Sequence, residues 1–273
     1  MKTIFPSYLQ PMQLQMLMQT AVSPRPIALA STIDKNGVPN VSPFSFFNMF
    51  SVNPPILVFS PLLKPQGNPV KDTLKNIQET QEVVIGNVNY KIAQQISIAS
   101  ADYDSETDEF VKSGLTKKSA DLAKPFLIEE SPVNFECKVL EIKSLGEKGG
   151  AGNLIICEVL KIHINEDYLN EQGILDQKKL DLVSRLGALW YGKTSAETLF
   201  EIPRPISGKV IGLDHLPNEI KNSKILTGND LGALSNIETL PEGKFSEDEN
   251  VHQEAQKLLQ ENKIEEAWKI LLL

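Results

Sequence analysis

Small hydroxyl, amide and aromatic side chains gather around several short segments in the N-terminal third of the chain. Such groups suit ligand binding better than proton transfer, because hydroxyls and amides meet a polar rim while aromatic rings cover a planar face. Lysine and threonine in the first turn of a helix add donors for an anion. These are the groups that a site for a planar anionic ligand would need. The residues are Ser31, Thr32, 42–48, Ser60, Lys71, Asp72 and Thr73.

An ordinary structural interpretation of the same residues stays open. In it Lys71 is solvated, Asp72 and Thr73 cap a helix, and the phenylalanines of 44–47 belong to the core. Composition alone favours this alternative. A binding site therefore needs support from more than residue types.

The sequence shows no pattern for a metal site, an activated nucleophile or a phosphate-binding loop. His163, His215 and His252 are far apart and form no HxH or HExxH motif, so we expect no metal site. No GxSxG, GxGxxG or GxxxxGK[ST] motif is present. The glycine-rich stretch 146–152 joins two expected strands without a following helix, which favours a hairpin loop over a phosphate cradle. No side chain is therefore assigned a catalytic role.

Composition and charge narrow the class of protein. The 273 residues carry 27 Lys+Arg against 35 Asp+Glu, a net charge of −8, and the basic residues form no run, which argues against nucleic-acid binding. A hydrophobic fraction of 41% allows a globular core. No apolar run approaches the roughly 20 residues of a membrane helix, and no secretory signal is evident, so we expect a cytoplasmic protein. Cys137 and Cys157 lack a CxxC pattern and are expected to be buried thiols.

Elements that could position the ligand-binding residues follow from the pattern of the chain. β-Branched runs at 27–33 and 38–42 flank Asn36-Gly37, a pair typical of a tight hairpin turn. Asn68-Pro69 begins an expected helix with apolar residues spaced four and three apart. We expect further strands at 56–60, 82–88, 133–142 and 153–164, a helix at 91–100, and an end to the β region near His163.

The C-terminal part changes character. Residues 203–241 are mixed and loop-rich, whereas 247–273 carry apolar stripes of helical spacing that Asn262 interrupts. One unit of a helical repeat is an alternative, but a single unit cannot bury its own apolar face. We therefore expect a helical appendage that packs on the β region or on a partner subunit.

A series of segments, in order, resembles the flavin reductase-like family, the flavoredoxin branch of FMN-binding split barrels. The similarity runs from about Ser23 to Pro205, with Ala188 at a position where the family commonly has glycine. The segments are Arg25–Thr32, Asn40–Asn48, Pro54-Pro55, Lys71–Ile77, Glu109-Phe110, Gly114–Thr116, Ser131–Cys137 and Arg185–Tyr191, followed by Phe200 and Arg204-Pro205.

The resemblance implies a mainly β fold, a six-stranded Greek-key split barrel with peripheral helices. We assign this domain to 1–205, and the remaining residues 206–273 form a C-terminal extension that is loop-rich and then helical. The resemblance also implies a homodimer with FMN at the subunit interface. Ser45, Phe46 and Phe47 would border the isoalloxazine, with Ser31 and Thr32 nearby. Around the phosphate it implies Ser60, Lys71, Asp72 and Thr73, and near the open flavin face or from the other subunit His163, Arg185 and Tyr191.

A flavin enzyme needs no protein nucleophile, because the isoalloxazine takes hydride at N5 while the protein positions it. The resemblance thus implies an FMN oxidoreductase that uses NADH or NADPH and passes electrons to flavin, a small acceptor or a redox protein. One alternative is a non-enzymatic FMN electron shuttle reduced by a partner protein. Another is a degenerate barrel that acts as an interaction scaffold through its C-terminal residues.

Overall fold

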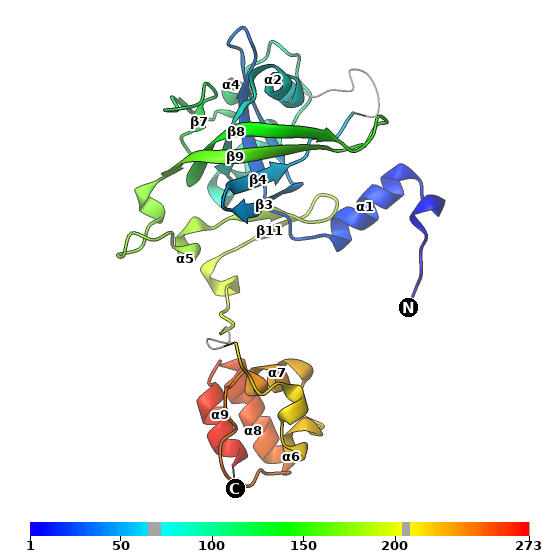
Figure 1. Ribbon diagram of the computed structural model, residues 1–273, viewed down its shortest axis with the longest axis vertical. Coiled ribbons are helices and arrows are strands. Elements are labelled where there is room, and N and C mark those ends of the chain that lie inside the picture. Colours follow the sequence, from blue (N-terminus) through cyan, green and yellow to red (C-terminus); the bar gives the residue numbers. More distant parts are fainter. Residues whose placement is uncertain (65–71, 204–207, 273) are drawn as a thin grey trace. The chain divides into compact units, whose positions relative to one another are not determined.

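The chain forms two compact units, Met1–Leu199 (unit 1) and Phe200–Leu273 (unit 2) (Figure 1). The structure is a computed structural model, and it describes residues 1–64, 72–203 and 208–272. None of the helices in these ranges is both long enough and apolar enough to cross a membrane. The expected boundary near residue 205 falls close to the division between the units.

Unit 1 is built on one seven-stranded sheet whose neighbouring strands are all antiparallel. The strand order is β2-β1-β5-β8-β9-β4-β3, which leaves β2 and β3 at the two edges. The strands are β1 (Ala28–Ile33), β2 (Pro39–Phe44), β3 (Phe47–Val52), β4 (Pro55–Phe59), β5 (Glu82–Asn87), β8 (Val133–Ser144) and β9 (Asn153–Ile164).

The hairpin β1–β2 forms where the sequence predicts it. Asp34 accepts hydrogen bonds from the backbone amides of Asn36 and Val38, both at 2.8 Å, and Gly37 has a φ of +91° that suits glycine. This turn sets Thr32 opposite Asn40 across the two strands. Thr32 and Asn40, which both belong to the candidate site described below, are therefore neighbours because of a local turn.

The sheet contains one strand more than the six expected. Residues 47–52 have no clear alternation, but they form β3 because a turn at Asn53-Pro54 folds them onto β4. A bulge between Met49 and Ser51 interrupts the pairing. The segment after β2, which is not among the expected strands, is thus an edge strand.

Strands β8 and β9 are the longest of the sheet and run side by side (Figure 1). The glycine-containing stretch 145–152 connects them, as the sequence predicts. Cys137 on β8 and Cys157 on β9 are free thiols whose side chains are buried in the core. Burial raises the pKa of both thiols, that of Cys157 to about 12, so neither is a reactive thiolate.

Helices and short strands surround this sheet in unit 1. α2 buries Thr73, Leu74, Asn76 and Ile77 against the sheet, and the expected helix at 91–100 is a 3₁₀ turn followed by α3. The proposed start of α2 at Asn68-Pro69 lies outside the described residues. The elements are η1 (Pro6–Tyr8), α1 (Pro11–Ala21), α2 (Asp72–Thr80), η2 (Tyr90–Ile92), α3 (Ala93–Ile98), α4 (Glu109–Ser113), β6 (Lys117–Lys118), β7 (Leu127–Ile128), η3 (Glu166–Tyr168), α5 (Gln177–Leu180), β10 (Val183–Arg185), β11 (Tyr191–Lys193) and η4 (Ala196–Thr198).

Unit 2 is a small helical unit with its own apolar core, which includes Ile220, Leu234, Trp268 and Leu271. The expected break at Asn262 is confirmed, since this residue has a φ of +61° between two helices. The loop-rich stretch 203–241 also contains short helices that its mixed composition does not predict. The elements are η5 (Leu213–His215), α6 (Asn218–Lys221), α7 (Gly228–Ser235), α8 (Glu249–Gln260) and α9 (Ile264–Leu271).

Candidate functional site

A buried polar network joins the first turn of α2 to strands β1 and β2. The hydroxyls of Thr73 and Thr32 donate to Oδ1 of Asn40 at 2.7 and 3.3 Å. Asn76 Nδ2 donates to Thr32 Oγ1 at 3.2 Å, and Asn40 Nδ2 donates to Glu109 Oε1 at 3.0 Å. All these residues are buried, so water competes little with the bonds. The network therefore fixes the start of α2 against the sheet.

Glu109 is the acidic member of this network and the first residue of α4. Burial raises the pKa of its carboxyl, and the nearby charge of Asp72 acts in the same direction. Its Oε2 atom is buried without a hydrogen-bond partner. The network holds this carboxyl beside the start of α2.

Two hollows meet at Lys64, which contributes to the lining of both. The smaller one, here called the α2 hollow, has a volume of about 30 Å³ and lies at the start of α2. The larger one, the β2–β4 pocket, has a volume of about 300 Å³. The α2 hollow is lined by Asn40, Ser42, Lys64, Asp72, Thr73, 99–103 and Glu109, and the β2–β4 pocket by Gln15, Gln19, 43–46, Ser60, 62–64 and Gly150.

Five of the nine residues that the resemblance implies around FMN line these two hollows. Ser45 and Phe46 follow β2, and Ser60 follows β4, so the ends of two strands bring them to the β2–β4 pocket. Asp72 and Thr73 begin α2 and line the α2 hollow. Asp72 also accepts a hydrogen bond from the Ser105 hydroxyl at 2.9 Å. Residues that are distant in sequence thus give the two hollows an apolar wall, a rim of hydroxyl groups and the N-terminal end of α2.

The other residues expected beside the ligand lie elsewhere or are not described. Thr32 belongs to the buried network, whereas its neighbour Ser31 points to the opposite face of β1 because strand side chains alternate. Ser31 is fully buried, and its hydroxyl has no partner. Phe47 packs against the core from the start of β3. Lys71 lies outside the described residues.

Arg185 and Tyr191 lie opposite each other on the hairpin β10–β11. The Arg185 guanidinium lies 4.5 Å from the centre of the Tyr191 ring and donates to the carbonyl of Ala188 at 2.9 Å. The backbone of Arg185 pairs with that of Arg25. Neither Arg185 nor Tyr191 lines the β2–β4 pocket, and both belong to the segment that holds the end of α1.

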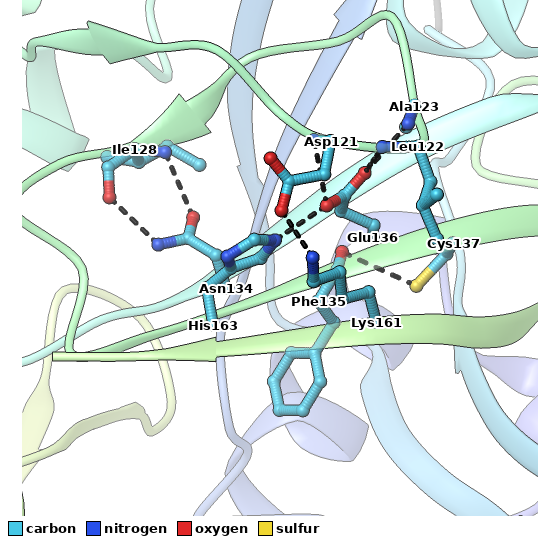
Figure 2. A network of polar contacts seen from close by, with 10 residues as sticks. All are labelled: Asp121, Leu122, Ala123, Ile128, Asn134, Phe135, Glu136, Cys137, Lys161 and His163. Atoms are coloured by element: carbon cyan, nitrogen blue, oxygen red, sulfur yellow. Dashed lines mark hydrogen bonds and ion pairs between the residues drawn. The ribbon is translucent and has the colours of Figure 1, made fainter.

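His163 belongs to a separate polar cluster on β8 and β9, and it does not line the hollows (Figure 2). Its Nε2 lies 2.6 Å from Oε1 of Glu136, which is fully buried. The backbone amides of Asp121, Leu122 and Ala123 also donate to the Glu136 carboxylate, at 2.6–3.1 Å. Burial alone would raise the pKa of Glu136, but these hydrogen bonds outweigh it and lower the pKa to about 2.

This cluster also brings together three potential metal ligands, Asp121, Glu136 and His163, with ligand atoms within 4.8 Å of one another. The Glu136 oxygens already accept four hydrogen bonds, and Asp121 forms an ion pair with Lys161. Both carboxylates are satisfied without an ion. The arrangement therefore fastens the 121–123 loop to the sheet.

Sequence reasoning assigned no role to several residues that complete the site. Asn40 and Glu109 link the network, and Lys64, Gln15 and Gln19 line the hollows. A signal existed for Asn40, because Asn40, Ser42 and Phe44 alternate along β2 and must share one face. No pattern indicated Gln15 and Gln19, which reach the pocket from α1 through tertiary packing.

A family model described as "Flavin reductase like domain" matches residues 19–191. The chain belongs to the flavin reductase-like family. An uncharacterised protein of Halalkalibacterium halodurans is 37% identical over 187 residues, which are 68% of this chain and 88% of that protein. The family match ends before unit 2, so unit 2 is an addition to the part that the family model covers.

Solved structures with the same fold include a monooxygenase component and a nitroreductase. Nitrilotriacetate monooxygenase component B from Bacillus cereus matches with a TM-score of 0.68 and 27% identity, over 74% of this chain and 98% of that chain. A 2-nitrobenzoate 2-nitroreductase from Pseudomonas fluorescens matches with a TM-score of 0.65 and 26% identity, over 74% and 96%. The expected flavin reductase-like split-barrel fold is confirmed.

Proposed function

We propose that this flavin reductase-like protein binds FMN and is an NAD(P)H-dependent oxidoreductase. The observation that carries the proposal is the pair of adjoining hollows. The β2–β4 pocket offers an apolar wall for a ring system, and the α2 hollow offers the N-terminal end of a helix for an anion. Family membership supports a flavin-related function, and the names of the matched nitroreductase and monooxygenase component support oxidoreductase chemistry. Bound FMN would supply hydride acceptance at N5 and onward electron transfer.

The residues of the two hollows fit such a group. Phe46 and Pro43 offer apolar surface for the isoalloxazine, while Ser45 and Ser60 offer hydroxyls at its rim. Thr73 lies in the first turn of α2, where free backbone amides favour a phosphate. In this proposal Lys64, which forms an ion pair with Asp102, lies between ring and phosphate, and the buried network keeps the helix start in place. The roles of Lys71 and Asp72 at the phosphate remain part of the proposal.

The test is a visible spectrum of the purified protein with added FMN, followed by anaerobic addition of NADH and NADPH. We expect bound flavin whose absorbance bleaches rapidly with at least one donor. Bound flavin that stays oxidised with both donors, yet is reduced by dithionite, would contradict the enzyme proposal and favour an electron shuttle. A protein that takes up no FMN would contradict both and favour an interaction scaffold.

We further propose that the protein is a homodimer that pairs through the edge of the sheet at β3. Met49, Phe50 and Val52 on this edge strand are exposed, and an exposed apolar edge marks a partner surface. We expect a dimer mass in light scattering. Phe50→Glu should shift the protein towards monomer, whereas Val111→Glu, at an exposed position on α4, should not. A monomeric wild-type protein would contradict the proposal.

A further inference from the structure

Arg25 is a buried cation that holds three segments of unit 1 together. It is only 7% exposed, and its guanidinium donates to the backbone carbonyls of Gln19 and Val22 at the end of α1 and to that of Leu186 in the β10–β11 connection. The guanidinium carbon lies 6.0 Å from the centre of the Phe46 ring. Arg25 therefore connects α1 and the β10–β11 hairpin to the aromatic wall of the β2–β4 pocket.

The positive charge of Arg25 has no negative partner in the described part of the chain. Its hydrogen-bond acceptors are carbonyls, which carry no net charge, and no carboxylate of these residues lies within 4.0 Å of its nitrogens. Its Nε is buried without an acceptor. Burial, together with the like charge of Arg185, lowers the pKa of the guanidinium. A buried charge is costly unless it is paired, so an anion beside Arg25 would be stabilised.

A hollow beside Arg25 could hold such an anion. This α1 pocket has a volume of about 380 Å³, within the range of small-molecule sites. Arg25 is the charged residue among the described residues that line it, and most of the others are apolar. The lining consists of Pro11, Leu14, Gln15, Met18, Gln19, Val22, Arg25, Phe46, Leu62, Gly149 and Gly150.

The α1 pocket adjoins the β2–β4 pocket. The two have Gln15, Gln19, Phe46, Leu62 and Gly150 in common. In the proposed function the isoalloxazine lies against Phe46 in the β2–β4 pocket. A molecule in the α1 pocket would then lie next to the flavin ring, where an electron acceptor must bind.

We propose that the α1 pocket binds a small aromatic carboxylic acid, with its carboxylate beside Arg25 and its ring against the apolar walls. As a substrate class this rests on the proposed FMN site. A carboxylate matches the planar guanidinium and neutralises its single charge. A phosphate monoester carries nearly two negative charges, and the described residues of the lining offer no second cation. The apolar side chains of Leu14, Met18 and Phe46 favour an aromatic body over a small inorganic anion.

The first experiment compares benzoate with benzamide, which has nearly the same shape but no charge. Calorimetric titrations of the full chain, with and without saturating FMN, measure both affinities. We expect benzoate to bind at least tenfold more tightly than benzamide. Equal affinities, or binding of neither compound in either form, would overturn the proposal.

A matched pair of variants tests whether the preference arises at this pocket. Met18 lines the α1 pocket but not the β2–β4 pocket, and it is exposed on α1. Met18→Glu places a carboxylate near Arg25 and should abolish the tenfold preference for benzoate. Met18→Gln has the same length without the charge and should retain it. An unchanged preference in Met18→Glu would show that benzoate binds elsewhere and would overturn the proposal.

The titrations with and without FMN distinguish a failure of this inference from a failure of the proposed function. If FMN does not bind but benzoate is preferred over benzamide, the proposed function fails and the anion site stands. If FMN binds and is reduced by NAD(P)H, yet benzoate and benzamide do not differ, the proposed function stands and the anion site is refuted. Thermal unfolding of both Met18 variants checks that the fold is intact.

Discussion

Glu136 is fully buried and yet ionised, because His163 and three backbone amides hydrogen-bond to its carboxylate. Glu136→Gln keeps the size of the side chain but turns an NH₂ group towards amide donors. Unsatisfied buried donors typically cost about 1–3 kcal/mol. We therefore expect the variant to lose about 2 kcal/mol of unfolding free energy at pH 7, measured by urea denaturation.

The lowered pKa of Glu136 predicts that the stability of the protein depends on pH. The pKa of Glu136 is about 2 in the folded protein, against an ordinary value of 4.5. Well above pH 4.5 the Glu136 carboxyl is ionised in both the folded and the unfolded state, and its full stabilisation is present. As the pH falls from 4.5 to 2, the unfolded state takes up the proton first, so stability is lost. Urea denaturation across this range should show a steeper loss for wild type than for Glu136→Gln. Glu141→Gln, at an exposed position on β8, is the control, and equal slopes for wild type and Glu136→Gln would contradict the role of Glu136.

Ala188 has a φ of +48°. A side chain disfavours this left-handed region, whereas glycine enters it freely. Ala188→Gly should therefore stabilise unit 1 by about 0.5–1 kcal/mol, seen as a higher Tm. Ala188→Val, with a branched β carbon, should lower the Tm. A lower Tm for Ala188→Gly would show that the loop does not strain this residue.

At the scale of elements, α1 depends on a close approach to the β10–β11 connection. A Cβ added to Gly187 would lie 2.1 Å from Thr20 Oγ1 and 3.1 Å from the Thr20 Cα. Gly187→Ala must therefore displace the end of α1, at a cost of about 1–3 kcal/mol. Hydrogen exchange should show faster exchange of the α1 amides. Gly228→Ala, where a new Cβ meets nothing within 4 Å, is the control, and unchanged α1 protection in Gly187→Ala would refute the dependence.

Local sequence rules predicted the strands and helices that local interactions determine. Asn36-Gly37 fixed the first hairpin, and long alternating runs fixed β8 and β9. The rules failed for β3, which becomes a strand because a turn folds it onto β4. They also failed for α6 and α7, which are four and eight residues long and depend on packing in unit 2 rather than on intrinsic propensity.

The candidate site was predictable where residue types or the family resemblance pointed to a ligand. Ser45, Phe46, Ser60 and Thr73 line the hollows, and their types already suggested ligand binding. The bond between Asn40 and Glu109 spans 69 positions, so no local pattern could reveal it. The resemblance implied that His163 lies near the flavin or comes from the other subunit, and this stays a prediction; in the structure its Nε2 contacts Glu136.

At the scale of the molecule, unit 2 has a core of its own and lies outside the residues that the family model matches. We expect it to unfold in a separate transition. The two tryptophans of the chain make this measurable, because Trp268 is buried in unit 2 while Trp190 is exposed in unit 1. In a Trp190→Phe background, Trp268 emission therefore reports on unit 2 alone.

His252 offers a way to weaken unit 2 selectively. Its Nδ1 lies 2.7 Å from Ser223 Oγ and its Nε2 lies 2.7 Å from the Ser246 carbonyl, so it joins two loops within the core. His252→Ala leaves a cavity and unpaired groups, and we expect a loss of about 2–3 kcal/mol in the Trp268 transition. The exposed His215→Ala should change it little. FMN affinity, followed by flavin fluorescence, should be the same in wild type and both variants because the hollows belong to unit 1. If His252→Ala weakened FMN binding as much as it weakened unit 2, the flavin site would depend on unit 2, and the proposed site within unit 1 would be incomplete.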